Sequence, residues 1–188
     1  MSTYINIEKQ NALKEFKYTF EKFISKTRNK HDSIVILCIG TDRSTGDSLA
    51  PLVGHKLQNL KQDSIYIYGS LHDTVHGKNL VETIDKIKAT HRNPLIVAID
   101  ACLGRMDHVG YINMWEGGLK AGTGVGKDLP KVGDISIAGI VNFSGFMDFM
   151  VLQNTKLSLV MKMADMIADG IKDVLEIKIN SSDKYCFN

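Results

Sequence analysis

The sequence predicts an α/β fold, a three-layer α/β/α sandwich built around a mostly parallel sheet. Short apolar runs rich in Ile and Val recur along the chain, at 34–39, 65–68, 95–99 and 135–141. Runs of this kind are typical of parallel strands that helices cover on both faces. Helical patterns lie between the first three runs, as expected of βαβ units with right-handed crossovers. The length of 188 residues fits a single domain over 1–188.

Composition and charge exclude several classes of function. Lys and Arg number 23 against 21 Asp and Glu, a formal net charge of +2 with no block of like charges, so we expect no nucleic-acid partner. Cys38, Cys102 and Cys186 lie far apart, which favours a reduced intracellular protein over a disulfide framework. The N-terminus lacks an apolar signal region and no run reaches the roughly 18 residues of a membrane span. We therefore expect a cytoplasmic protein without a membrane partner.

The first elements are an amphipathic helix, a strand and a second helix. Phe16, Phe20 and Phe23 recur at helical spacing among Lys and Glu, which predicts a helix over 8–26, within an N-terminal segment 1–30, that packs on the sheet. The strand at 34–39 ends at Gly40, and a helical pattern resumes at Asp47 and runs to about residue 60. Between them lies a loop of small and polar residues.

The later elements follow from the same patterns. After the strand at 65–68, they are expected in this order: a helix at 80–90, a strand at 95–99 that ends on Asp100, an extended segment at 107–115, a Gly-rich loop at 117–133, a strand at 135–141, a helix at 146–171, a strand at 174–179 and a polar tail at 180–188. The methionines of the long helix are expected in the core rather than in a binding groove.

The expected strand order brings three loops to one edge of the sheet. In the common order, the strand at 34–39 lies between those at 65–68 and 95–99. Ligands of open α/β sheets bind at the carboxyl ends of such strands. The candidate residues at this edge are Asp47, Asp100 and His76.

The two aspartates allow structural and functional interpretations. Thr-Gly-Asp47-Ser before a helical pattern is a common helix start, so Asp47 fits an N-cap as well as a catalytic group. Asp100 ends an apolar strand, where a carboxylate needs a charged partner, a metal, a functional role or hydrogen bonds from loop N–H groups. At a separation of about 4 Å, two carboxylates repel by about 4 kcal/mol, or roughly three pKa units. Such a pair shares a proton or binds a cation.

Three further patterns carry less weight. The segment His72-Asp-Thr-Val-His76 has the spacing of a zinc-peptidase motif, but Gly77 follows at once and no apolar helix contains both histidines. The Gly-rich run 121–127 departs from a phosphate-binding loop at both ends, and is interpreted as a loop whose backbone approaches something closely. Cys102 could act as a nucleophile with His76 or His108, although a small apolar filler is the favoured role.

The motifs together resemble a known family. Gly40-Thr-Asp-Arg-Ser-Thr-Gly-Asp47-Ser-Leu-Ala-Pro51, then Ala98-Ile-Asp100-Ala, then Ala121-Gly-Thr-Gly-Val-Gly126 resemble the germination protease family of spore-forming bacteria. The shorter YyaC-type sporulation proteins, often called spore proteases, are more similar still. The resemblance spans about residues 32–170, and three motifs in the right order make it fairly specific.

The resemblance implies a phosphorylase/hydrolase-like fold, shared with the hydrogenase-maturation endopeptidases. It also implies an atypical aspartic-type peptidase of spore germination, which degrades small acid-soluble spore proteins with two aspartates that fall on Asp47 and Asp100. The Gly-Val-Gly segment of the family falls on Gly124 to Gly126. In the hydrogenase-maturation relatives an acidic residue at the position of Asp47 helps to recognise a metal, which leaves a divalent metal at Asp47 and Asp100 open.

We expect a sporulation-associated peptidase (a hydrolase) that acts on a protein or peptide and needs no cofactor. Asp47 and Asp100 would be catalytic, with supporting or substrate-binding roles for Thr41, Asp42, Ser44, His76 and Gly124. The resembled family has Asn at the position of Thr41 and an aromatic residue at that of Asp42, and it is longer, with a removable pro-segment. Two alternatives stay open: a non-catalytic sporulation protein that binds a peptide or partner in the same cleft, and a metal-dependent endopeptidase. A homo-oligomer is compatible with all three.

Overall fold

The computed structural model describes residues 2–60, 64–121 and 130–182. Its main sheet contains six strands: β1 (Ser2–Asn6), β2 (Ser33–Cys38), β3 (Ile65–Tyr68), β4 (Pro94–Gly104), β5 (Tyr111–Glu116) and β8 (Ile135–Phe143). Five α-helices accompany it among these residues: α1 (Ala12–Thr27), α2 (Leu49–Leu57), α3 (Leu80–Thr90), α4 (Asp148–Gln153) and α5 (Leu157–Ser182). Short 3-10 turns occur at η1 (Arg28–Lys30), η2 (Gly46–Ser48) and η3 (Met106–His108).

The sheet is mixed but mostly parallel, in the order β1-β5-β8-β4-β2-β3. β2 pairs in parallel with β3 on one side and β4 on the other, and β4 pairs in parallel with β8. This confirms the predicted place of the strand at 34–39 between its two neighbours. β5 is antiparallel to both of its neighbours, β1 and β8, so it alone runs in the opposite direction to the other five strands.

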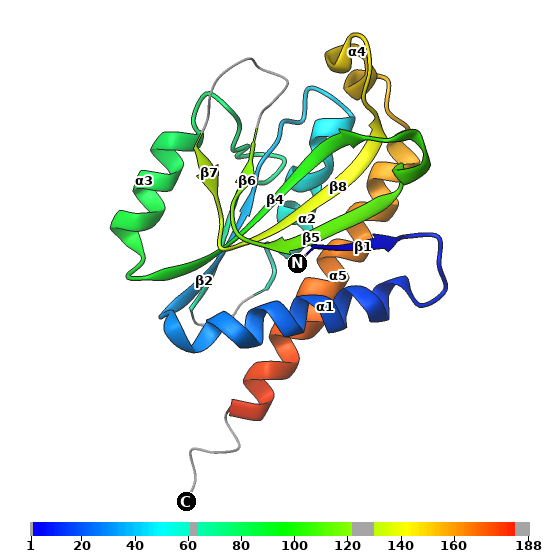
Figure 1. Cartoon of the computed structure of the whole chain (residues 1–188). Coiled ribbons are helices and arrows are strands. Elements are labelled where there is room, and N and C mark those ends of the chain that lie inside the picture. The colour runs from blue at the N-terminus through cyan, green and yellow to red at the C-terminus, as the bar shows by residue number, and fades with distance from the viewer. Residues whose placement is uncertain (1, 61–63, 122–129, 183–188) are drawn as a thin grey trace, which may run out of the picture.

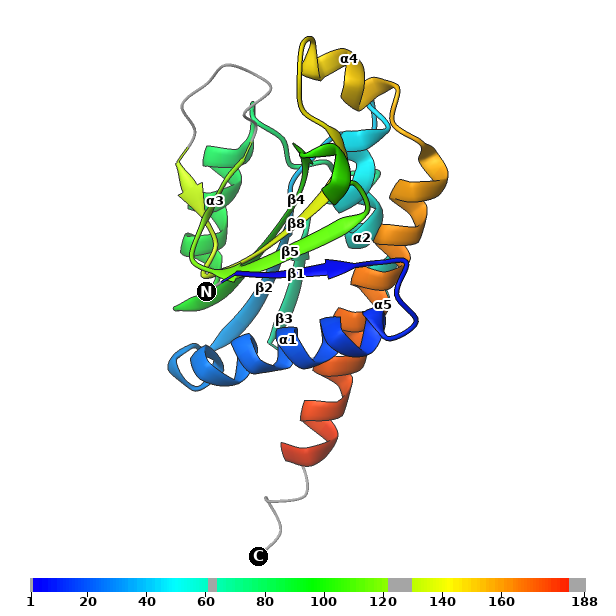
Figure 2. The same cartoon turned by 45° about the vertical axis from the view of Figure 1, so that its right-hand side comes forward.

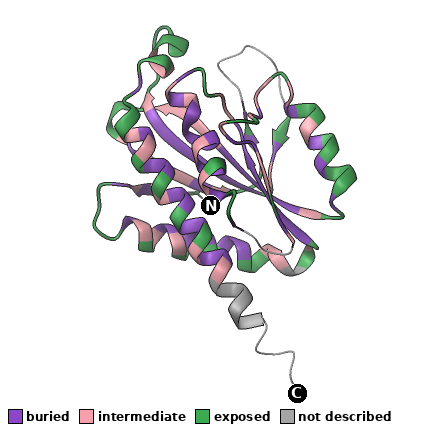
Figure 3. Cartoon of the chain, turned by 180° about the vertical axis from the view of Figure 1, so that it is seen from behind, coloured by how far each residue is buried: buried purple, intermediate pink, exposed green. Residues whose placement is uncertain are grey.

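Helices cover both faces of the sheet, which confirms the predicted fold class (Figures 1 and 2). α1, α2 and α5 pack on one face, where the largest buried side chains include Phe16, Phe20 and Ile36. The other face carries α3 and a small hairpin of β6 (Leu119–Lys120) and β7 (Lys131–Val132), with a smaller core around Leu37, Leu80 and Ile87. Between these layers, β2 is wholly buried, as are most of β8 and the first half of β4 (Figure 3).

Two differences from the expected elements lie at the edges of the fold. β1 was not predicted; it pairs antiparallel with β5 from Ser2 opposite Trp115 to Asn6 opposite Tyr111. The predicted Gly-rich loop at 117–133 includes the strands of the β6–β7 hairpin, whereas residues 122–129 lie outside the described residues.

The C-terminal prediction was wrong in two respects. The single helix predicted at 146–171 is two helices, α4 and α5, and the strand predicted at 174–179 is part of α5, which runs to Ser182. Val174 and Leu175 continue the buried stripe of α5 begun by Val160 and Ile167, so packing on the core selects the helix. The rest of the predicted tail, 183–188, lies outside the described residues. None of the described helices has the length and apolar content needed to cross a bilayer.

Candidate functional site

The loop of residues 40–48, which we call the aspartate loop, connects β2 to α2 at the carboxyl edge of the sheet. Backbone hydrogen bonds close it: Thr41 N–H donates to the carbonyl of Asp47 at 3.1 Å, and Ser48 N–H donates to that of Ser44 at 3.0 Å. Gly40 has φ +157°, and a Cβ there would collide with the Asp47 carbonyl and lie 2.9 Å from Pro51 Cδ. Only glycine lets the loop fold this tightly onto its own start.

Asp47 lies in η2, half-buried, rather than at a helix cap. α2 begins at Leu49 with Ser48 as its N-cap residue, and the side chain of Ser48 makes no capping hydrogen bond. The structural role predicted for Asp47 is therefore not the one observed, and its carboxyl group is left for other chemistry. η2 packs against β4, the strand that carries Asp100.

Burial raises the pKa of the Asp47 carboxyl group above its ordinary value. The nearby Ser44 hydroxyl acts in the opposite direction and lowers this pKa. The contact falls short of a full hydrogen bond, because Ser44 Oγ is buried without a partner of hydrogen-bonding geometry among the described residues. Desolvation, rather than the repulsion by Asp100 considered from the sequence, thus favours the protonated form of Asp47.

Asp100 lies inside β4 and not at its end as predicted, because β4 continues to Gly104 beside β8. Its position is nevertheless special: the pairing of β2 with β4 ends at Cys38 opposite Ile99. The next residue of β4 is therefore Asp100, at the point where the chain of β2 turns away into the aspartate loop. Asp100 Oδ1 accepts a hydrogen bond from Ala101 N–H at 2.8 Å, so the carboxylate is held at this edge.

Cys102 is not an activated nucleophile. Burial, with a further contribution from the negative charge of Asp100, raises the pKa of its thiol to about 12. The thiol stays protonated at neutral pH, and only the thiolate attacks carbonyl groups well. The favoured prediction of a small filler agrees with this environment.

His76 borders the aspartate loop through its backbone. Val75 forms a parallel bridge with Ile39, and its carbonyl accepts a hydrogen bond from Gly40 N–H at 2.7 Å. His76 is half-buried, and its Nδ1 accepts from Lys78 N–H at 3.4 Å, which leaves Nε2 as the nitrogen that can carry the proton. The structure thus brings His76 alongside the start of the aspartate loop.

The other predicted supporting residues divide into two groups, three on the aspartate loop and one outside the described residues. Ser44 is buried in the aspartate loop, whereas Asp42 is exposed on it and Thr41 Oγ1 accepts a hydrogen bond from Arg43 N–H at 3.3 Å. Gly124 lies outside the described residues. The loop thus carries three of the five.

The described residues do not supply a metal site at this edge. No group of three or more His, Cys, Asp or Glu among them is arranged to hold a metal ion. His72 is exposed, and its ring contacts that of His55 with centroids 5.6 Å apart. Because α3 begins only at Leu80, His72 and His76 share no helix. Two carboxylates are too few ligands for a divalent cation held by protein alone.

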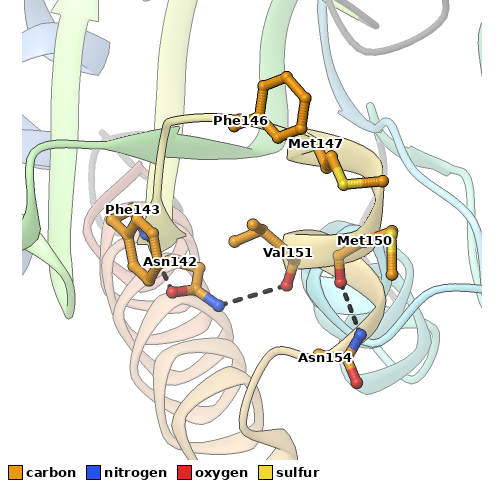
Figure 4. Close-up of a pocket in the computed structure, with 7 residues that line it drawn as sticks. All are labelled: Asn142, Phe143, Phe146, Met147, Met150, Val151 and Asn154. Atoms are coloured by element: carbon orange, nitrogen blue, oxygen red, sulfur yellow. Dashed lines mark hydrogen bonds between the residues drawn. The ribbon is translucent and has the colours of Figure 1, made fainter.

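An exposed apolar hollow of about 390 Å³ lies beside the aspartate loop, and it was not predicted from the sequence. It is lined by Asn142, Phe143, Phe146, Met147, Met150, Val151 and Asn154 (Figure 4). Met147 and Met150 are 56% and 48% exposed, so the prediction that the methionines of this region belong to the core was wrong for them. The dense run of Phe and Met between 143 and 150 was the available signal.

Comparisons with known proteins agree with this fold. A family model described as "Protein of unknown function (DUF1256)" matches residues 4–170. The chain is 48% identical over 168 residues to the "Uncharacterized protein YyaC" of Bacillus subtilis (strain 168). The aligned region covers 89% of this chain and 81% of that protein. This confirms the resemblance to the YyaC-type proteins.

Among solved structures, the fold is similar to that of the [NiFe] hydrogenase maturation protease HycI from Thermococcus kodakarensis KOD1. The TM-score is 0.55 at 20% sequence identity, over 84% of this chain and 99% of that one. At this identity the likeness shows a shared fold, and it confirms the fold relationship to the hydrogenase-maturation endopeptidases.

Proposed function

We propose that this chain, which belongs to the DUF1256 family of proteins of unknown function, is a peptidase that hydrolyses peptide bonds with Asp47 and Asp100. One observation carries the proposal. A half-buried aspartate with a raised pKa lies in a tight loop that packs against the strand of a second aspartate, at the carboxyl edge of the sheet. Titratable groups perturbed by their environment are common at catalytic sites.

The environment of Asp47 suits a general acid. Because burial favours its protonated form, Asp47 can donate a proton to the departing amide nitrogen. Asp100 then acts as the general base and takes a proton from a water molecule while the water oxygen bonds to the scissile carbonyl carbon. The tetrahedral intermediate collapses, the C–N bond breaks, and the products are a carboxylic acid and an amine.

The polar neighbours have supporting roles in this scheme. Ser44 Oγ is buried without a partner of hydrogen-bonding geometry among the described residues, and a small movement lets it donate to the Asp47 carboxylate that forms when the proton leaves. His76 borders the aspartate loop and Thr41 lies in it, and both would orient substrate or water. The protein substrate we favour is the class of small acid-soluble spore proteins, which is implied by the family resemblance.

Cleavage assays with matched variants test the proposal. Purified protein is incubated at pH 5 to 8 with small acid-soluble spore proteins and, separately, with a defined synthetic peptide library, and products are measured by mass spectrometry. Asp47→Asn and Asp100→Asn should each lower kcat by about 100-fold or more, whereas Asp85→Asn on the outside of α3 should leave it unchanged.

Circular dichroism and thermal unfolding show whether each variant is folded. Cleavage by both Asp→Asn variants at the wild-type rate would remove this mechanism. A folded wild-type protein that binds peptides and never cleaves them would favour a partner-binding role for the same edge of the sheet.

A further inference from the structure

A cluster of apolar side chains projects from the molecule next to the aspartate loop. We call it the α4 patch and define it as Phe143, Phe146, Met147, Phe149 and Met150, which are 38%, 91%, 56%, 61% and 48% exposed. No residue of α4 is fully buried, and Leu152 is its one side chain packed, partly buried, against the main core. Contiguous exposed apolar surface of this kind marks interaction sites.

The patch is held in place by a polar anchor at its base. Asn142 Nδ2 donates to the carbonyl of Val151 and to Thr155 Oγ1, both at 3.2 Å, and Thr155 Oγ1 donates to the same carbonyl at 2.9 Å. Asn142 is the penultimate residue of β8 and Thr155 is buried. The patch therefore lies between the end of β8 and an α4 helix tied to that strand, and such preorganisation lowers the entropy lost on binding.

The backbone at Met147 helps to expose the patch. Met147 adopts a left-handed conformation, φ 66° and ψ 48°, at the start of α4. Figure 4 shows the ring of Phe146 directed away from the ribbon, and the ring of Phe143 on the other side of Val151 from Met147 and Met150 in this view. A methionine is strained in this conformation, and strain of this kind is concentrated at functional sites.

The helix that carries part of the patch packs against the aspartate loop. α4 contacts η2, and a Cβ at Gly46 would lie 2.8 Å from Leu152 Cδ2 and 3.1 Å from Thr155 Oγ1. Gly46 immediately precedes Asp47, so the patch and the proposed catalytic aspartate are carried by neighbouring elements.

Area and charge indicate which partner fits. Three partly exposed Phe and two Met side chains offer on the order of 500 Å² of apolar surface, less than the roughly 800 Å² per partner of a stable interface. That size suits a transient partner better than a second copy of this chain. Asp148 is the sole charged residue within 142–155, so an anionic membrane is repelled and a basic partner is attracted.

We propose that the α4 patch binds the polypeptide substrate through a segment with aromatic or long aliphatic side chains beside a Lys or Arg. The apolar side chains enter the hollow between Phe143 and Met150, and the basic residue pairs with Asp148. The inference rests on the proposed peptidase function, since it names the recognition surface of that site.

Binding is measured separately from cleavage. Asp47→Asn protein is titrated with synthetic 12-residue peptides of equal net charge, in which Phe, Leu or Met beside Lys are replaced in turn by Ser. We expect the apolar peptides to bind at least 10-fold more tightly than their Ser counterparts. Adding Phe146→Ser and Met150→Ser should remove that preference, whereas Tyr18→Ser, at an aromatic residue of α1 that is 69% exposed, should keep it. Asp148→Lys should weaken binding of the Lys-containing peptides.

Each other outcome overturns the inference. An apolar preference that survives Phe146→Ser with Met150→Ser places recognition elsewhere. A concentration-dependent dimer that the same substitutions abolish, and that excludes peptide, assigns the patch to a second copy. Binding to phosphatidylglycerol vesicles without peptide preference assigns it to a membrane. Failure of the peptidase proposal is distinguishable, because it appears as absent cleavage while patch-dependent peptide binding persists.

Discussion

The aspartate loop and the α4 patch belong to neighbouring elements of the fold, and each departs from the usual distribution of polar and apolar side chains. The loop buries polar residues, with Ser44 and Ser48 only 5% and 7% exposed. The patch exposes Phe and Met at and before α4, a helix with no fully buried residue. Burying polar groups and exposing large apolar ones does not favour folding. Local departures from the rules of folding are expected at functional sites, and here two of them lie on neighbouring elements.

The two regions should also differ in how well they tolerate substitution, and the largest loss of stability is expected at Gly40 in the aspartate loop. Gly40→Ala places a Cβ against the Asp47 carbonyl and 2.9 Å from Pro51 Cδ, and backbone cannot move aside cheaply. We expect a loss of more than about 3 kcal/mol in the free energy of unfolding, measured by urea denaturation. Gly145→Ala, in the loop before α4, meets no atom within 4 Å and should cost far less. Equal losses would mean that the two loops are equally constrained.

An intermediate effect is expected at the anchor of the patch. Asn142→Ala removes hydrogen bonds to Val151 and Thr155, which should cost about 1 to 2 kcal/mol and loosen α4. Asn154→Ala is a matched control, because its one side-chain hydrogen bond, to the Met150 carbonyl, is exposed. Hydrogen exchange of the α4 amides should rise in the first variant and change little in the second. Unchanged exchange in Asn142→Ala would mean that other contacts hold the helix.

The smallest effect is expected for Asp47→Asn, which should stabilise the protein by removing the half-buried carboxylate of the aspartate loop. Burial raises the pKa of Asp47, so the folded state holds that proton more tightly than the unfolded chain does. The resulting loss of stability is absent below the ordinary aspartate pKa of about 3.9 and grows as the pH rises through the folded pKa. Asp47→Asn should therefore raise Tm by a few degrees at pH 7 and leave it unchanged near pH 3. Asp42→Asn, on the exposed part of the loop, should have a smaller effect. An equal Tm at pH 7 would contradict the desolvation argument.

The sheet was predictable where strands are covered on both faces. β2, β4 and β8 are continuous apolar runs, and the order of β3, β2 and β4 follows from the crossover rules. β1 was not recognised, because an edge strand with Ile5 as its one fully buried side chain has too short an apolar pattern. Its pairing with β5 comes from residues more than 100 positions away.

The C-terminal half shows how tertiary contacts override local pattern. Val174 to Ile179 alternates like a strand, but the stripe of α5 packed on the core extends through Val174 and Leu175. No Pro or Gly announces the break between α4 and α5. Instead, the side chains of Asn142 and Thr155 donate hydrogen bonds to the Val151 carbonyl and so compete with the helical hydrogen-bond pattern. This competition cannot be predicted from local sequence, because it depends on β8 and α4 being adjacent in the fold.

The candidate site was predicted in part. The strand order brought Asp47, Asp100 and His76 to one edge, and the structure places them on elements that meet there. The continuation of β4 past Asp100 and the burial that raises the pKa of Asp47 depend on packing by β8 and α2. The methionines of the α4 patch have the composition of a core, so composition alone predicted them to be buried, whereas Met147 and Met150 are exposed.

The pairing of β1 with β5 has a consequence for synthesis on the ribosome. The strand at residues 2–6 leaves the exit tunnel before the other described strands, but its partner at 111–115 emerges more than 100 residues later. At about 5 to 20 residues per second, the segment waits on the order of ten seconds with its hydrogen-bonding groups in water. β5 in turn needs β8 as its inner neighbour. β1 therefore joins the sheet only after β5 has been made, long after β1 itself.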